Sequence, residues 1–252
     1  MCELFGFSAE RKTDLNEYLE SFFSHSRLNP HGWGMMYEDG VRCVVREPVK
    51  ATDSVMLPAI LESIPPQKIM LAHIRYATVG SIAEENCHPF TAQDISGREW
   101  TLIHNGTIYS GGVTYRYYKQ QAGDTDSERL FLAFIDHMND VLSKGSITER
   151  ERFQTVSRFI ADNAPRNKLN LMLYDGELLY VHKNLKNTLS CKRVDGGIIF
   201  STQPLDEDGW AAFPIAQTIA YKNGSEVYRG ERHKGIFIPS LEYITALDAM
   251  NI

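Results

Sequence analysis

Short blocks of hydrophobic residues along the first half of the chain predict strands, several of them paired in hairpins. The stretch HGWGMMYEDGVRCVVREP (31–48) reads as two strands joined at Asp39-Gly40, a dipeptide that favours a tight turn. Three further stretches alternate or are strongly apolar, as buried strands are. They are CELFGFS at the start of the chain, KIMLAHIRYA (68–77) and WTLIHNGTIY (100–109).

Helical spacing of apolar residues appears in four other stretches. Residues 14–26 and 124–142 carry apolar side chains three and four positions apart, and the second of these opens with acidic residues. Residues 52–64 predict a short helix opened by Thr52 or Asp53 and interrupted by Pro58. Residues 146–164 predict a fourth helix, with Ser146 and Glu149 at the spacing of a capping box.

The last third of the chain returns to strands. Residues 168–184 read as a hairpin turning at Asp175-Gly176, and strands are predicted within 196–205 and 225–230. Hairpins without regular β-α-β alternation favour an α+β fold with antiparallel sheets. No internal repeat or break in composition divides the chain, so we expect one domain over residues 2–252.

Composition narrows the classes of partner. Hydrophobic residues make up 43% of the 252 residues and charged residues 23%, which is ordinary for a globular protein. A formal net charge of -6 argues against nucleic acid or an anionic membrane surface as the main partner. No apolar run approaches the ~20 residues that span a bilayer, and the N-terminus does not read as a signal peptide. We therefore expect a cytoplasmic protein with reduced cysteines.

The four cysteines are Cys2, Cys43, Cys87 and Cys191. They form no C-x-x-C pair and no zinc spacing with histidine, so no metal is expected. Cys2 is unusual because it directly follows the initiator methionine. It is either a small residue opening a strand or, once Met1 is removed, a residue that carries both a thiol and a free α-amino group.

Three other polar clusters lie within apolar surroundings. Arg75 ends an apolar strand, where it could pair with an Asp or Glu of the protein or grip a substrate carboxylate as a bidentate fork. Asn105-Gly106 could be a simple turn or the donors of an oxyanion hole. Asp126 could be a favourable acid at a helix start or the partner of a substrate ammonium. A free amino acid with a side-chain carbonyl would use all four clusters.

The ordered set of motifs resembles the class II glutamine amidotransferase domain, and most closely its stand-alone YafJ-like group. The motifs are the Cys2 start, NPHGWGM (29–35), HIRYATVG (73–80), NCHPF (86–90), HNGTI (104–108), TDSE (125–128), and the late Ser201-Thr202-Gln203-Pro204-Leu205 with Trp210. This resemblance implies an N-terminal nucleophile hydrolase fold, a four-layer αββα sandwich of antiparallel sheets.

The resemblance also implies roles for matching positions. Cys2 would be the nucleophile, Asn105 and Gly106 the oxyanion hole, Arg75 the site of the α-carboxylate and Asp126 that of the α-ammonium. Thr78 would form part of the pocket wall, and His88 would lie in a loop bordering the pocket. A Cys–His dyad with His73 or His104 is the competing arrangement, but both histidines lie on apolar strands, where hydrogen-bonded core histidines are expected.

Three functions fit these residues. The first is release of ammonia from glutamine, with no cofactor; transfer of the ammonia would need a separate ammonia-accepting synthase. The second is hydrolysis of another γ-glutamyl compound, such as a γ-glutamyl amide or peptide. The third is a non-catalytic glutamine sensor, which would need Arg75 and Asp126 but not a processed Cys2.

Overall fold

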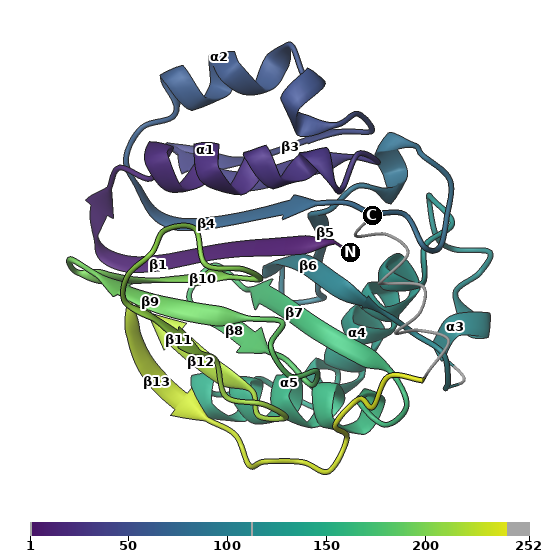
Figure 1. The fold of residues 1–252 in the computed structure, drawn as a ribbon. Coiled ribbons are helices and arrows are strands. Elements are labelled where there is room, and N and C mark those ends of the chain that lie inside the picture. Colours follow the sequence, from purple (N-terminus) through teal and green to yellow (C-terminus); the bar gives the residue numbers. More distant parts are fainter. Residues whose placement is uncertain (1, 112, 241–252) are drawn as a thin grey trace.

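The computed structural model describes residues 2–111 and 113–240, which form two antiparallel sheets stacked on each other (Figure 1). The first sheet has seven strands, in the order β11-β9-β10-β1-β4-β2-β3. Their bounds are β11 (Trp210–Ala212), β9 (Ser190–Val194), β10 (Gly197–Ser201), β1 (Glu3–Thr13), β4 (Gln67–Ile74), β2 (Trp33–Asp39) and β3 (Val41–Glu47).

The second sheet has six strands, in the order β13-β12-β8-β7-β6-β5. Their bounds are β13 (Ser225–Arg229), β12 (Ile219–Lys222), β8 (Leu179–His182), β7 (Lys168–Tyr174), β6 (Glu99–Thr107) and β5 (Phe90–Gln93). β7 pairs over its full length with residues Thr101–Thr107 of β6, which places Thr107 opposite Lys168.

Helices cover the outer face of each sheet, so the predicted four-layer αββα sandwich is confirmed (Figure 1). The helices α1 (Asn16–Ser24) and α2 (Met56–Ser63) lie on the first sheet, and α4 (Asp126–Leu142) and α5 (Glu149–Asn163) lie on the second. The shorter elements are α3 (Val113–Arg116) and the 3-10 turns η1 (His25–Arg27), η2 (Ala51–Asp53) and η3 (Glu84–Asn86).

Strand periodicity divides the apolar side chains among three cores, because successive residues of a strand face opposite sides of its sheet. On β4, Met70 and Ala72 pack toward α1 and α2, whereas Leu71 packs between the two sheets. On β6, Leu102 packs toward α4 and α5, whereas Ile103 packs between the sheets. Each sheet is therefore buried on both faces over the middle of its central strands.

The two hairpins predicted from Asp-Gly turns are confirmed. β2 and β3 pair on either side of Gly40, and β7 and β8 pair on either side of Asp175-Gly176. The amphipathic stretches become α1, α4 and α5 with the expected apolar residues buried.

Two predicted helix starts are wrong. Thr52 and Asp53 lie in the separate turn η2, and α2 begins at Met56, so Pro58 is its third residue. A proline in the first helical turn removes an N–H that has no intrahelical partner anyway, and the helix therefore continues through it.

The capping box of α5 is formed by Thr148 and Glu151 rather than by Ser146 and Glu149. Glu149 instead accepts hydrogen bonds from Lys222 on β12 at 2.7 Å and from Tyr228 on β13 at 2.9 Å. The Glu149 carboxylate, which the local pattern assigned to the helix cap, is therefore bonded to the edge of the second sheet instead.

Within residues 2–111 and 113–240, no helix has both the length and the apolar character needed to cross a membrane.

Candidate active site

The alternation of the strands brings four of the polar residues between the two sheets. Leu4 faces the interior, so Cys2, two residues earlier, continues that face; His73 lies opposite Leu4 on β4. On the second sheet, Asn105 and Lys168 continue the inward faces of Ile103 and Met172. The first strand begins, and β4 and β6 end, on the same side of the sandwich (Figure 1).

Cys2 is held by the backbone of the segment that follows β4. Its Sγ accepts a hydrogen bond from the Tyr76 N–H at 3.2 Å, and the thiol donates to the Tyr76 carbonyl at 3.3 Å. Burial raises the pKa of this thiol above its ordinary value, and the Tyr76 hydrogen bond and the charges of Lys168 and Arg75 oppose that rise. The thiol is therefore protonated at neutral pH in the resting site and needs a base to become a nucleophile.

The histidines beside these motifs are structural. His73 donates from Nε2 to the His104 carbonyl at 3.2 Å, which links β4 to β6 across the interior. His104 lies within hydrogen-bond distance of the Ser127 hydroxyl through Nδ1 and of the Lys168 carbonyl through Nε2. Burial lowers the pKa of His73 to about 3, so its ring is neutral. The expectation of hydrogen-bonded core histidines is confirmed, and neither ring bonds the Cys2 sulfur.

Asn105 presents a buried and unused donor. Its Oδ1 accepts a hydrogen bond from the Lys168 ammonium at 2.9 Å, whereas its Nδ2 is buried and has no hydrogen-bond partner among the described residues. A buried donor without a partner is costly and calls for an explanation. A substrate oxygen bound at Nδ2 would supply the missing partner.

Gly106 is required by close packing. A Cβ at this position would lie 1.9 Å from the Lys168 carbonyl oxygen and 2.1 Å from His104 Nε2. The backbone of β6 therefore approaches β7 and the His104 ring as closely as only glycine permits. Asn105-Gly106 lies within the strand, so the alternative interpretation of this dipeptide as a simple turn is wrong.

Replacing Gly106 by alanine is expected to lower the free energy of unfolding by about 3 kcal/mol, because the new methyl group overlaps backbone that must shift. Urea unfolding followed by circular dichroism measures the loss. Gly97→Ala is the control: its Cβ meets nothing within 4 Å, and only its left-handed φ of 81° adds strain, of about 1 kcal/mol. Equal losses in the two variants would contradict the packing argument.

Arg75 is buried, with 3% of its surface exposed, and bonds backbone carbonyls rather than a carboxylate. Its guanidinium donates to Ser81 O at 2.8 Å, Val79 O at 3.0 Å and Gly80 O at 3.4 Å. No Asp or Glu in the described part of the chain forms an ion pair with it. The salt-bridge explanation of Arg75 is therefore wrong, and its charge remains available to an anion.

Asp126 is the first residue of α4 and lies against the end of β6. Its Oδ2 accepts from the Ile108 N–H at 2.6 Å and its Oδ1 from the Ser127 N–H at 3.0 Å. Thr125 caps the helix by accepting from the Glu128 N–H at 3.2 Å. The sequence interpretation of Asp126 as an acid at a helix start is confirmed, and its buried carboxylate forms no ion pair among the described residues.

A hydrogen-bond network joins the loop around Arg75 to the start of α4, where Asp126 lies. Ser81, on the loop that wraps the Arg75 guanidinium, donates from its N–H to Asp124 at 3.0 Å. Asn86 donates to the Ser81 carbonyl at 3.0 Å and accepts from the Asp124 N–H at 2.8 Å. The loop after β4 and the N-terminus of α4 are therefore fixed relative to each other.

The two remaining predicted residues, Thr78 and His88, differ in their exposure to solvent. Thr78 is exposed on the loop after β4. His88 is 4% exposed and packs between His73 and Phe90, at 4.2 and 4.4 Å between ring centroids. Gly34 makes room for this segment, because a Cβ there would lie 2.1 Å from the His88 carbonyl.

The sequence did not single out Lys168 or Tyr76, which directly contact the predicted residues. Nor did it reveal how the late motif contributes: Thr202 accepts from the Leu4 N–H at 2.8 Å, and Gln203 donates to the buried Glu3 at 3.3 Å. These bonds hold the start of β1, and with it the backbone that carries Cys2. The signal for Lys168 was a charged residue at the head of an apolar strand.

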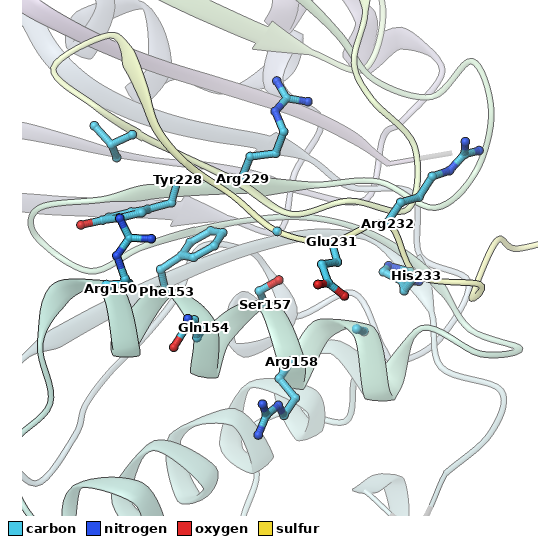
Figure 2. A pocket seen from close by; sticks show the side chains of 13 residues that line it. Arg150, Phe153, Gln154, Ser157, Arg158, Tyr228, Arg229, Glu231, Arg232 and His233 are labelled. Carbon is cyan, nitrogen blue, oxygen red and sulfur yellow. The ribbon is translucent and has the colours of Figure 1, made fainter.

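A groove of about 590 Å³ lies elsewhere, between α5 and residues 227–233 (Figure 2). It is lined by basic and polar side chains that include Arg150, Arg158 and Arg232. None of the predicted site residues borders it. The candidate active site is thus the cluster between the sheets, and the groove is a separate surface feature.

Sequence comparison supports the assignment of the motifs. Residues 1–196 match the family described as Glutamine amidotransferases class-II. Protein MJ1515 of Methanocaldococcus jannaschii is 28% identical over 92% of this chain and 72% of its own length. YafJ of Escherichia coli is 29% identical over 73% of this chain and 74% of its own length.

Solved structures share the fold at lower identity. The predicted glutamine amidotransferase of Pseudomonas aeruginosa aligns with a TM-score of 0.63 and 19% identity over 90% of this chain and 100% of that chain. Glutamine phosphoribosylpyrophosphate amidotransferase of B. subtilis aligns with a TM-score of 0.67 and 15% identity over 93% of this chain and 50% of that chain. The family match spans most of the sandwich, and the chain belongs to the class II glutamine amidotransferases, a family of enzymes.

Proposed function

We propose that this chain hydrolyses the side-chain amide of glutamine through a γ-glutamyl thioester on Cys2 and releases ammonia. The observation that carries the proposal is the buried Nδ2 of Asn105, a donor with no partner among the described residues, beside a thiol held between the same two sheets. The family membership of the chain and the order of its motifs support the same reaction.

In this reaction, removal of Met1 exposes the α-amine of Cys2. An α-amine has an ordinary pKa of about 7.7–8.0, which suits a base near neutral pH. It takes the proton of the Cys2 thiol, and the thiolate attacks the amide carbon. The amine then returns the proton to the departing ammonia, and water cleaves the thioester to give glutamate.

The tetrahedral intermediate places a negative charge on the former carbonyl oxygen. Asn105 Nδ2 and the Gly106 N–H are the proposed donors to this oxygen, and each such donor contributes about 10²–10³-fold in rate. Arg75 would bind the substrate α-carboxylate and Asp126 its α-ammonium. In this arrangement the buried charges of Arg75 and Asp126 both face the substrate.

The experiment that tests the function begins with the intact mass of natively produced protein. Loss of Met1 together with ammonia release from glutamine would support the proposal. Comparing glutamine with a panel of γ-glutamyl amides and peptides then decides the substrate: a preference for the larger compounds would replace glutamine by a γ-glutamyl compound. Retention of Met1 with glutamine binding but no ammonia release would support the sensor instead. A pull-down under native conditions would seek the proposed ammonia-accepting synthase.

Replacing Arg75 by lysine is expected to raise the KM for glutamine about 10-fold or more, because lysine keeps the charge and loses the fork that matches a carboxylate. Steady-state ammonia release measures the change. Arg42→Lys serves as a control, because the Arg42 guanidinium pairs with Glu99 on the second sheet instead. A KM that is unchanged in Arg75→Lys would return this residue to a structural role.

A further inference from the structure

Lys168 is a buried cation at the candidate site that the reaction above does not use. It is the first residue of β7, is 3% exposed and projects between the sheets. Its Nζ donates to Asn105 Oδ1 at 2.9 Å. Taking an ammonium out of water is costly, so a lysine at the end of a strand would ordinarily extend its side chain to solvent. Its inward position indicates a specific purpose at this site.

The contact determines which way the Asn105 amide faces. An asparagine side chain carries one acceptor oxygen and one donor nitrogen, and the two ends have nearly the same shape. An ammonium group can only donate, so it binds Oδ1 and repels Nδ2. Nδ2 is therefore turned away from Lys168, where it is buried and has no partner among the described residues. A flipped amide would present its oxygen to the developing oxyanion and destabilise it.

We propose that Lys168 is a positioning residue that locks the Asn105 amide with Nδ2 toward the reacting carbonyl. The inference rests on the proposed function, because that function places the oxyanion at Nδ2. Lys168 also lies close enough to Cys2 for their charges to attract, which favours the thiolate. Burial lowers the pKa of Lys168 to about 8, so the group remains mostly protonated at pH 7.

The first test is a double-mutant cycle on kcat with glutamine. Lys168→Met is expected to lower kcat by about 10–100-fold with KM changed less than about 3-fold, because the lost contact acts on the transition state. In an Asn105→Ala background, the same substitution is expected to cost clearly less than in the wild-type background, because the contact with Asn105 is already gone and only the effect on the Cys2 thiol remains. Equal costs in both backgrounds would show that Lys168 does not act through Asn105 and would overturn the proposal.

The matched control is Lys183→Met. Lys183 is also a buried lysine, is 2% exposed and donates from Nζ to the Leu189 carbonyl at 2.8 Å, following β8. Its substitution removes the same charged group from a position directly after a strand of the same sheet, without touching Asn105. We expect kcat within about 3-fold of wild type once unfolding has been checked by circular dichroism. A loss equal to that in Lys168→Met would assign both effects to general destabilisation.

The second test needs no substrate. Iodoacetamide alkylates the Cys2 thiolate, and the reaction is followed at the N-terminal peptide by mass spectrometry. The dependence of its rate on pH gives the thiol pKa. Lys168→Met is expected to raise that pKa by about one unit, and Lys183→Met to leave it unchanged. If wild-type protein releases no ammonia from glutamine but the thiol pKa moves as expected, the proposed function fails while the placement of Lys168 beside Cys2 stands. If neither kcat nor the thiol pKa responds to Lys168→Met, the inference itself is wrong.

Lys168→Gln provides a second test of the proposal if Lys168→Met does not fold. Glutamine keeps a side-chain donor for Asn105 Oδ1 and removes the charge. The proposal expects it to retain more of kcat than Lys168→Met does, while the thiol pKa rises as much. A kcat equal to wild type together with an unchanged thiol pKa would overturn the proposal in this variant too.

Discussion

Replacing Cys2 by alanine is expected to reduce ammonia release from glutamine to background, a loss on the order of 10⁴-fold or more, because removal of the proposed covalent nucleophile leaves only substrate binding and the proposed oxyanion donors. We do not expect Cys87 to substitute for it. Cys87 lies near the site, but its thiol is bonded to the carbonyls of Glu47 and Ala83, and burial raises its pKa to about 11. The measurement is initial-rate ammonia release at saturating glutamine.

Cys87→Ala is the matched control, since it removes a buried thiol from the neighbouring segment without touching the proposed machinery. We expect its rate to stay within about 3-fold of wild type. Intact mass must show the same state of Met1 in wild type and both variants. Ammonia release that persists in Cys2→Ala would remove Cys2 as the nucleophile, and with it the thioester.

Acidification is expected to unfold the protein steeply, because several histidines are buried in the neutral form. Burial lowers the pKa of His73 and of His182 to about 3, and also lowers those of His88 and His104. In the unfolded chain each returns to its ordinary value near 6.5. Between pH 6.5 and 3 the unfolded state therefore binds protons that the folded state does not, so the free energy of unfolding falls as pH falls.

Each proton taken up contributes a slope of about 1.4 kcal/mol per pH unit across that range, so His73 and His182 together give about 3 kcal/mol per pH unit at most. Urea unfolding at half-unit steps from pH 7.5 to 4.5 measures it. His182→Gln is expected to lower the slope by about 1.4 kcal/mol per pH unit, which corresponds to one proton. His137→Gln, at a half-buried position on α4, serves as the control. A slope that is the same in all three proteins would contradict this origin of the acid sensitivity.

Local patterns predicted the α+β class with antiparallel sheets, whereas the four-layer form of the fold and the roles of the proposed site residues came from the family resemblance. Asp-Gly turns predicted the two hairpins, and apolar spacing predicted α1, α4 and α5. The short strands β5, β9, β11 and β12 were not predicted, because each has only three to five residues and gains its order from a neighbouring strand. Residues 241–252 lie outside the described residues.

The parts of the site that escaped prediction depend on pairing between distant strands. Lys168 contacts Asn105 only because β6 and β7 pair in one register, with Thr107 opposite Lys168. Tyr76 contacts Cys2 through backbone atoms, which carry no sequence signature. Similarly, Thr148 and not Ser146 caps α5 because Lys222 and Tyr228 take the carboxylate of Glu149. A local pattern cannot report such choices between competing partners.

The raised pKa of the Cys2 thiol also bears on oxidative damage. Peroxide attacks thiolates far faster than thiols, and the first product is a sulfenic acid that further oxidation makes irreversible. A protonated Cys2 thiol whose sulfur accepts a hydrogen bond from the Tyr76 N–H is therefore expected to be a poor target for peroxide. The burial that disfavours ionisation of the Cys2 thiol therefore also lowers its sensitivity to oxidation.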